Sequence, residues 1–381
     1  MKSRSEMGIL AVAFVWFTTH FGGGFASGRQ IVDFFVAYGW YALFTPILSI
    51  AIVTLMLYYA WTFAVTHNTF DYRAWGNKYF KPFDAIFSNA YEVMYILILL
   101  IASAVAFATG GTVMNQILGT PYVTNTVIVA VFIFLLTIFG ADTVRKAAST
   151  MAVIIIAGMT IIYVGNLFVN FPRLLEVIRT APSPRGFLEA LWASLKYAGF
   201  QACAMGAYIA VADALKTRED ARKTSVWGFI INAGVLWLAT AGVLLHYPEI
   251  LQEKVPVLYV AAHGGSGGFG TAIVSLLIFL AVISTGVSLI FGGARRIVAF
   301  WARTRGSSIA GDRKVNIAAS LVYVLITWGI ALFGLIPLVA KGYGYMGTLS
   351  LPLLILPVII IGLFRSKNWG KDESSEGTPE D

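Results

Sequence analysis

The chain has 381 residues, of which 58% are hydrophobic and 12% are charged, and its formal net charge is +8. A charged fraction of roughly half the usual value excludes an ordinary soluble domain and predicts an integral membrane protein. The single cysteine, Cys203, excludes a disulfide framework and a thiolate metal site.

Ten apolar stretches are long enough to cross a hydrocarbon core about 30 Å thick, for which a helix needs roughly twenty residues. We expect membrane-spanning helices over residues 8–36, 40–65, 85–116, 122–140, 146–170, 188–214, 224–246, 266–303, 315–334 and 336–363. The predicted fold class is therefore an all-α membrane protein.

The basic residues indicate an orientation, because cytoplasmic loops of membrane proteins are enriched in Lys and Arg. With the N-terminus inside, the cytoplasmic segments collect 20 of the 27 Lys and Arg, namely Lys2, Arg4, Arg73, Lys78, Lys81, Arg145, Lys146, Lys216, Arg218, Arg222, Lys223, Arg295, Arg296, Arg303, Arg305, Arg313, Lys314, Arg365, Lys367 and Lys371. Both termini are then expected in the cytoplasm of a multi-pass protein of the cell membrane. The basic excess is a topology signal, so no nucleic-acid partner is predicted.

The first apolar stretch is interrupted at its midpoint by Gly22, Gly23 and Gly24, followed by Phe25, Ala26, Ser27 and Gly28. Non-helical backbone at mid-membrane is tolerated only where protein buries it or a cavity hydrates it. Freed amides and carbonyls there would form a site for a small charged ligand or an ion. Gly24 and Gly28 also fit GxxxG, a pattern of close helix packing, and both interpretations remain open.

The chain divides into two groups of five helices, residues 1–175 and 186–364, followed by a cytoplasmic tail over 365–381 that we expect to be disordered. Because five is odd, the second group enters the membrane from the opposite side, and the halves form an inverted repeat as in many secondary transporters. The sixth span should then be interrupted like the first, near Gly199 and Gln201. A single glycine can equally mark a packing contact.

The segment from Gly22 to Phe35, GGGFASGRQIVDFF, resembles the corresponding stretch of the YkvI-like bacterial membrane proteins. These form a branch of the amino acid, polyamine and organocation (APC) transporter superfamily, and the five-plus-five arrangement with interruptions in spans one and six resembles the LeuT-like fold. One departure is Gln30, which stands where members of that branch often carry an acidic residue.

The resemblance also implies a sodium site. Ala281, Ser284 and Thr285 match the A-x-x-S-T pattern that supplies a carbonyl and two hydroxyls to sodium in coupled members of the fold. Thr19 and Gly22 are the expected ligands on the first span. The alternative is that these hydroxyls bond back to the preceding turn of their own helix. No Lys occurs in the fifth span, where some proton-coupled relatives carry one, and this favours sodium.

Charge complementarity predicts how a substrate would bind. Amides of Gly23, Gly24, Phe25 and Ala26, with Gly22 beside them, would hold a carboxylate. Carbonyls of Tyr197, Ala198 and Gly199 would receive an ammonium group. Phe25, Phe200 and Gln201, with Ala108 and Thr109 of the third span, would contact the substrate side chain.

Ionisable residues inside spans are candidates for function. Arg29 and Asp33 are four residues apart and are expected to pair as part of an outer gate. Lys196 would attract an anionic substrate or extend to the membrane interface. Glu92 is either an inner-gate partner of an Arg or a solvated acid near a helix start, and we favour the latter. His20 is either a proton-coupling group or a donor to a neighbouring helix.

The predicted function is secondary active transport of a small zwitterionic solute, with an amino acid as first candidate, by sodium-coupled alternating access. Alternatives are a proton-coupled transporter or exchanger of amino acids or amines, and a non-transporting sensor or channel on the same fold. Neither HExxH nor a P-loop occurs, so no enzyme is predicted. Beyond the substrate, the coupling ion and the lipid bilayer, the sequence predicts no cofactor or partner.

Overall fold

A computed structural model of the chain describes residues 2–139, 141–264, 267–305 and 312–369, with the side chains of 2–5, 141–149 and 303–305 left out. Within these ranges the secondary structure is entirely helical. The structure is therefore that of an all-α, multi-pass membrane protein.

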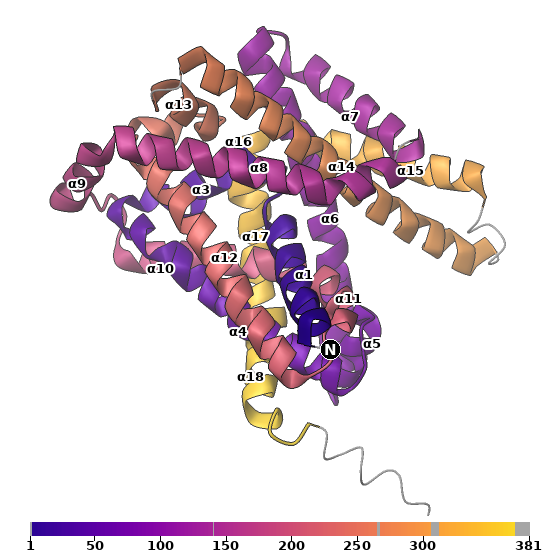
Figure 1. Ribbon diagram of the computed structural model, residues 1–381. Coiled ribbons are helices and arrows are strands. Elements are labelled where there is room, and N and C mark those ends of the chain that lie inside the picture. The colour runs from indigo at the N-terminus through magenta and orange to yellow at the C-terminus, as the bar shows by residue number, and fades with distance from the viewer. Residues whose placement is uncertain (1, 140, 265–266, 306–311, 370–381) are drawn as a thin grey trace, which may run out of the picture.

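The first half of the chain runs from α1 to α9 (Figure 1). Its elements are α1 (Lys2–His20), α2 (Gly23–Ala26), α3 (Arg29–Phe34), η1 (Val36–Leu43), α4 (Thr45–Thr66), α5 (Tyr72–Tyr79), α6 (Asp84–Leu118), α7 (Tyr122–Phe139), α8 (Ala141–Val169) and α9 (Phe171–Thr180).

The second half runs from α10 to α18. Its elements are α10 (Phe187–Ala202), α11 (Met205–Ala210), η2 (Ala212–Ala214), α12 (Arg218–Leu244), η3 (Glu249–Gln252), α13 (Pro256–His263), α14 (Gly267–Arg305), α15 (Arg313–Ala331), α16 (Leu335–Pro337), η5 (Leu338–Tyr343), α17 (Gly344–Ser350), η6 (Leu351–Ile355) and α18 (Leu356–Arg365).

Eight of the predicted spans are confirmed as helical stretches long and apolar enough to cross a membrane. They are Thr45–Thr66, Asp84–Leu118, Tyr122–Phe139, Thr150–Val169, Arg218–Leu244, Gly267–Ala302, Arg313–Ala331 and Leu335–Arg365. The two other predicted spans, the first and the sixth, are each divided into shorter helices. The first becomes α1, α2 and α3, and the sixth becomes α10 and α11.

Gly28 separates α2 from α3. Its φ is +80°, a left-handed conformation that glycine adopts without steric cost. A Cβ at this position would also lie 2.7 Å from Cγ2 of Val257 in α13. Both constraints call for glycine, and the close approach places the start of α13 against the first span.

The helices pack around the divided segments. Helix α4 contacts α12, α8 contacts α14, and α10 contacts α17, while α1 packs on α12 and α2 packs on α6 and α14. In Figure 1 the N-terminus lies at the lower end of the molecule with α5, α11 and the end of α18, and α13 and α16 lie at the opposite end. Many large apolar side chains on the outer faces are exposed, among them Ile161, Phe168 and Phe333, as lipid-facing surfaces require.

The beginning of the predicted tail is ordered against the helices. Trp369 is buried against Phe63 and Tyr79, and Arg218 donates to its carbonyl. The rest of the tail, residues 370–381, lies outside the described residues.

Candidate functional site

The first interruption follows the triple glycine. Helix α1 ends at His20, Gly22 is extended, and α2 begins at Gly23. The amides of Phe25 and Ala26 both donate to the carbonyl of Gly22, at 3.0 Å each. Only the first two amides of α2, those of Gly23 and Gly24, therefore donate no hydrogen bond within this helix. The prediction that the amides of Phe25 and Ala26 are free is wrong, because the turn uses them.

The glycines of this interruption also allow close packing. A Cβ on Gly23 would lie 3.3 Å from Cγ2 of Val282 in α14, and a Cβ on Gly24 would lie 3.0 Å from Cγ1 of Val105 in α6. The same residues thus interrupt the helix and admit its neighbours, and their role as a binding site stays a prediction.

The second interruption lies later than predicted. Helix α10 continues through Gly199 and Gln201 to Ala202, and only Cys203 and Ala204 separate it from α11. Gly199 is a packing glycine, since a Cβ there would lie 2.2 Å from the carbonyl oxygen of Gly347 in α17. The predicted break at Gly199 is therefore wrong, and the packing alternative is confirmed.

This shift affects the predicted ammonium site. The carbonyls of Tyr197 and Ala198 lie inside α10, where each accepts from the amide four residues later. The prediction that they are free for a ligand is wrong. The carbonyl of Gly199 accepts from Sγ of Cys203 at 3.5 Å.

A cavity of about 320 Å³ opens where the two interruptions meet. Its volume lies within the range of small-molecule sites, roughly 300–1,000 Å³. It is lined by Thr18, Thr19, His20, Phe21, Gly22, Gly23, Gly24, Gln30, Tyr95, Ile98, Leu99, Ala102, Ala152, Ile155, Ile156, Phe200, Gln201, Ala204, Ala207, Ser284, Thr285, Ser288, Leu289 and Tyr343. None of these lining residues is an Asp, Glu, Lys or Arg.

Part of the predicted site lines this cavity. Gly22, Gly23, Gly24, Phe200 and Gln201 do so, as do Thr19, Ser284 and Thr285 from the predicted sodium set. Outside the lining are Phe25, Ala26, Tyr197, Ala198, Gly199, Ala281, Ala108, Thr109, Lys196, Arg29 and Asp33.

Two of the predicted sodium ligands, Gly22 and Thr285, lie side by side between α1 and α14. A Cβ on Gly22 would lie 3.4 Å from Cγ2 and 3.7 Å from Oγ1 of Thr285. Among the described residues the Thr285 hydroxyl has no hydrogen-bond partner. Ser284 and Thr19 do bond back to their own helices, to the carbonyls of Ala281 and Val15 at 3.2 and 2.8 Å. The back-bonding alternative thus holds for two of the three hydroxyls.

His20 joins three helices at the edge of the cavity. Its Nδ1 is 2.8 Å from Oδ1 of Asn232 in α12, and its Nε2 is 2.6 Å from the hydroxyl of Tyr197 in α10. The ring is 3% exposed. Because both ring nitrogens are engaged, the histidine fixes the end of α1 against α10 and α12, as the structural alternative predicted.

Aromatic rings cover the cavity on the side of α3. Phe200 stacks on Tyr343 with centroids 4.6 Å apart and planes 8° apart. Phe34 contacts Phe200 and Tyr197, each at 5.5 Å between centroids. Phe200 was predicted to contact a substrate side chain, whereas Tyr343 was not.

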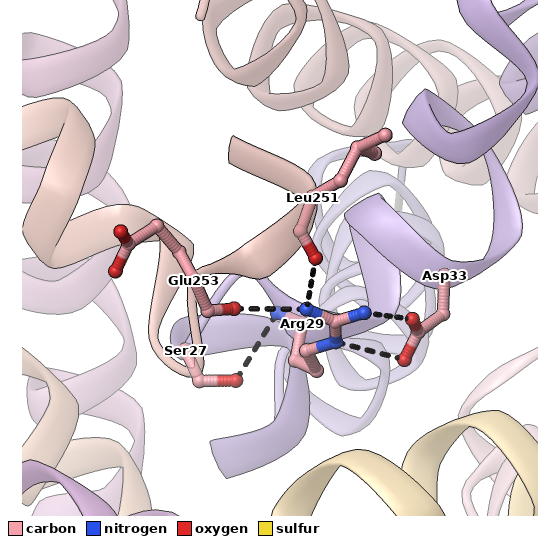
Figure 2. Close-up of polar contacts among 5 residues, drawn as sticks. All are labelled: Ser27, Arg29, Asp33, Leu251 and Glu253. Carbon is pink, nitrogen blue, oxygen red and sulfur yellow. Dashed lines mark hydrogen bonds and ion pairs between the residues drawn. The ribbon is translucent and has the colours of Figure 1, made fainter. Parts of the chain in front are cut away.

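Arg29 pairs with Asp33 as expected, and it also binds a distant segment (Figure 2). Its Nη1 donates to the carbonyls of Leu251 and Glu253, at 3.2 and 2.8 Å. Nearby, the amide of Val257 donates to the carbonyl of Ser27 at 3.2 Å. We call this set of bonds the Arg29 latch; it fastens residues 251–257 over the start of α3.

Glu92 is paired with an Arg and its side chain is 30% exposed, so the prediction of a solvated acid missed its partner. Nη1 of Arg296 in α14 donates to Oε1 of Glu92 at 2.6 Å, and the hydroxyl of Tyr72 donates to Oε2 at 2.5 Å. The guanidinium lies 4.5 Å from the ring centroid of Tyr95. This inner cluster joins α5, α6 and α14 in the half of the molecule opposite to the Arg29 latch.

Several lining residues were missed by sequence reasoning. Ala152, Ile155 and Ile156 of α8 and Ile98 of α6 are apolar residues within apolar helices, so no sequence signal separates them from lipid-facing neighbours. Gln30 did carry a signal, since it is a polar residue in the first span.

No family model and no curated protein matches this sequence. Solved structures do match over nearly the whole chain. MhsT in complex with L-phenylalanine matches with 15% identity and a TM-score of 0.59, covering 97% of this chain and 92% of that one. The manganese transporter of Eremococcus coleocola matches with 12% identity and a TM-score of 0.52, covering 99% and 88%. At such identities the likeness shows the fold, which is that of LeuT-like transporters.

Proposed function

We propose that the protein is a secondary active transporter that carries an amino acid across the cell membrane by sodium-coupled alternating access. In this proposal α1–α3 and α10–α11 each form one interrupted span, which brings the total to ten. Residues 1–175 and 186–364 are inverted repeats, and both termini are cytoplasmic. The alternatives of proton coupling, exchange, sensing or a channel use the same fold, and no observation favours one of them.

The observation that carries the proposal is the cavity between the two interruptions. The first interruption contributes Gly22, Gly23 and Gly24, and the second contributes Ala204. Transporters with interrupted spans bind substrate and coupling ion where such breaks meet. The fold shared with MhsT, which binds L-phenylalanine in its solved structure, is consistent with this function.

The lining favours a substrate with no net charge. A charged ligand would lose hydration in a cavity whose described lining holds no Asp, Glu, Lys or Arg to compensate it. A zwitterion meets this condition, with its carboxylate at the amides of Gly23 and Gly24. Phe200 and Tyr343 favour an apolar or aromatic side chain. Manganese, which one structural neighbour transports, is a poor fit for this lining. Carboxylates are among its preferred ligands, and the described lining has none.

The proposed coupling ion is sodium. Gly22, Ala281, Ser284, Thr285 and Thr19 offer neutral oxygens, which suit a hard monovalent cation at a helix break. Thr285 lies beside Gly22, its hydroxyl has no partner among the described residues, and it is the ligand that we consider best placed.

The conformation corresponds to the inward-facing state of the proposed cycle. From the interruptions the lining continues to Tyr95 and Ala152, near the starts of α6 and α8, and to Ser288 beyond the middle of α14. In the proposed topology these are the cytoplasmic halves of their helices. The Arg29 latch and the ring pair of Phe200 and Tyr343 close the outer side.

Thermal unfolding of the detergent-purified protein with a panel of amino acids, in sodium and in choline, tests the proposal. A ligand at about a hundred times its Kd should stabilise the folded state by roughly 2.7 kcal/mol. A sodium-dependent shift for one amino acid is expected. A folded protein that responds to no amino acid in either salt would contradict the proposed function.

The matching variant is Gly23→Leu, because Gly23 borders the cavity and a side chain there would meet Val282 of α14 and displace the first interruption. Uptake into proteoliposomes should be abolished while the protein remains in the membrane. Gly234→Leu is the control, because nothing lies within 4 Å of a Cβ built on Gly234 and the residue is outside the cavity. Retained uptake by Gly23→Leu would refute the location of the site.

A further inference from the structure

Gln30 is a buried amide with an unused acceptor. It lies in α3, is 4% exposed, and lines the cavity. Its Oε1 has no hydrogen-bond partner among the described residues. Leaving a buried acceptor unpaired costs about 1–3 kcal/mol, so such atoms in native proteins call for an explanation.

The backbone makes room for this side chain. A Cβ on Gly24 would lie 2.5 Å from Nε2 of Gln30 and 3.4 Å from its Cδ. Only glycine at position 24 lets the carboxamide lie across the first interruption. The Nε2 end of the carboxamide is thereby placed against Gly24, at the edge of the same cavity.

A ligand that binds there must bring a donor to Oε1. The α10 carbonyls expected to receive an ammonium group are engaged in their own helix. No carboxylate lines the described cavity, so Gln30 offers a buried neutral acceptor at the first interruption, whose free amides suit a carboxylate. Adjacent donors and acceptors of this kind match the two ends of an α-amino acid.

We propose that Oε1 of Gln30 accepts a hydrogen bond from the substrate's amino group and so makes the protein select α-amino acids over the corresponding acids. This inference rests on the proposed function and specifies the ammonium contact that the α10 carbonyls leave unassigned. Gln30 is then the residue that determines specificity for the amine.

The test uses three probes that share one aromatic group: L-phenylalanine, 3-phenylpropionate, which lacks the amine, and phenethylamine, which lacks the carboxylate. Binding of each to the purified full-length protein is measured by titration in sodium. Gln30→Met keeps the approximate volume and removes the acceptor. It should weaken L-phenylalanine about ten- to a hundredfold, the range for a hydrogen bond to a charged group, and leave 3-phenylpropionate unchanged.

Gln30→Glu is the second variant, and it keeps both shape and acceptor while adding a negative charge. It should bind phenethylamine at least tenfold more tightly than the wild-type protein, because the cavity then holds one charge to compensate the ammonium. Gln201→Met serves as a matched comparison, since Gln201 lines the same cavity from α10.

The outcomes separate the inference from the function on which it rests. If the wild-type protein binds an amino acid, and Gln30→Met still discriminates L-phenylalanine from 3-phenylpropionate as before, the role of Gln30 is overturned and the transporter proposal stands. An equal loss in Gln201→Met would likewise overturn a role particular to Gln30. If the folded wild-type protein binds no amino acid, both proposals fail.

Discussion

Replacing Arg29 by Met should release residues 251–257 from the start of α3. The substitution removes the bonds from Nη1 to the carbonyls of Leu251 and Glu253. A hydrogen bond involving a charged group contributes about 1.5–3 kcal/mol. Two bonds at the lower value amount to about 3 kcal/mol, which raises the population with this segment open on the order of a hundredfold.

A cysteine at position 257 reports the opening. Val257 is fully buried, and its side chain lies against Gly28 at the end of the fastened segment, residues 251–257. The only native cysteine, Cys203, is also fully buried, so the background reaction should be slow. The assay follows the rate at which Val257→Cys reacts with a membrane-impermeant thiol reagent added outside intact cells, with and without Arg29→Met.

Asp33→Asn is the control for this experiment, because it weakens the ion pair and leaves both carbonyl bonds of Arg29 in place. Its reaction rate should rise much less than that of Arg29→Met. Equal rates in the two variants would refute the reasoning, since the ion pair and not the carbonyl bonds would then hold the segment. An unchanged rate in Arg29→Met would also refute it.

Two further predictions concern the other side of the cavity. Thr285→Ala should lower the apparent sodium affinity by about tenfold, because one polar contact with the ion is lost. Thr54→Ala is the control, since its hydroxyl only bonds back to its own helix. Unchanged sodium dependence in Thr285→Ala would contradict the ion assignment. Glu92→Gln should raise the rate at which Ala207→Cys is labelled from the cytoplasmic side by no more than about fivefold. The ion pair of Glu92 with Arg296 is partly exposed and contributes about 1 kcal/mol or less. A rise near a hundredfold would contradict this estimate.

The first interruption was predictable because several residues act together there. Three consecutive glycines weaken a helix, and Gly28 permits the left-handed turn that starts α3. The second interruption was placed at Gly199, yet the helix breaks only after Ala202, without a glycine. A lone glycine carries two meanings that the sequence does not separate, and the contact of Gly199 with Gly347 decides between them.

Charged contacts were predicted when they were local and missed when they were distant. Arg29 and Asp33 are one helical turn apart, so their pairing follows from spacing alone. Glu92 and Arg296 are 204 residues apart and meet only because α6 packs on α14. The hydrogen bonds of Arg29 to the carbonyls of Leu251 and Glu253 could not be predicted either, because every residue has a backbone carbonyl and no residue type identifies the ones that accept.

The contacts near the two ends of the cavity, which are the outer and inner ends in the proposed topology, differ in strength. At the outer end, Arg29 is 6% exposed and bonds a carboxylate and two carbonyls. At the inner end, the side chains of Arg296 and Glu92 are 25% and 30% exposed, so water screens their attraction. We therefore expect the ligand-free protein to favour the inward-facing state, and outward opening to require ligands that bind the outward state better. The labelling rates at positions 257 and 207, measured in one preparation, test this order: faster reaction at 257 from outside would show that the outer end is the weaker.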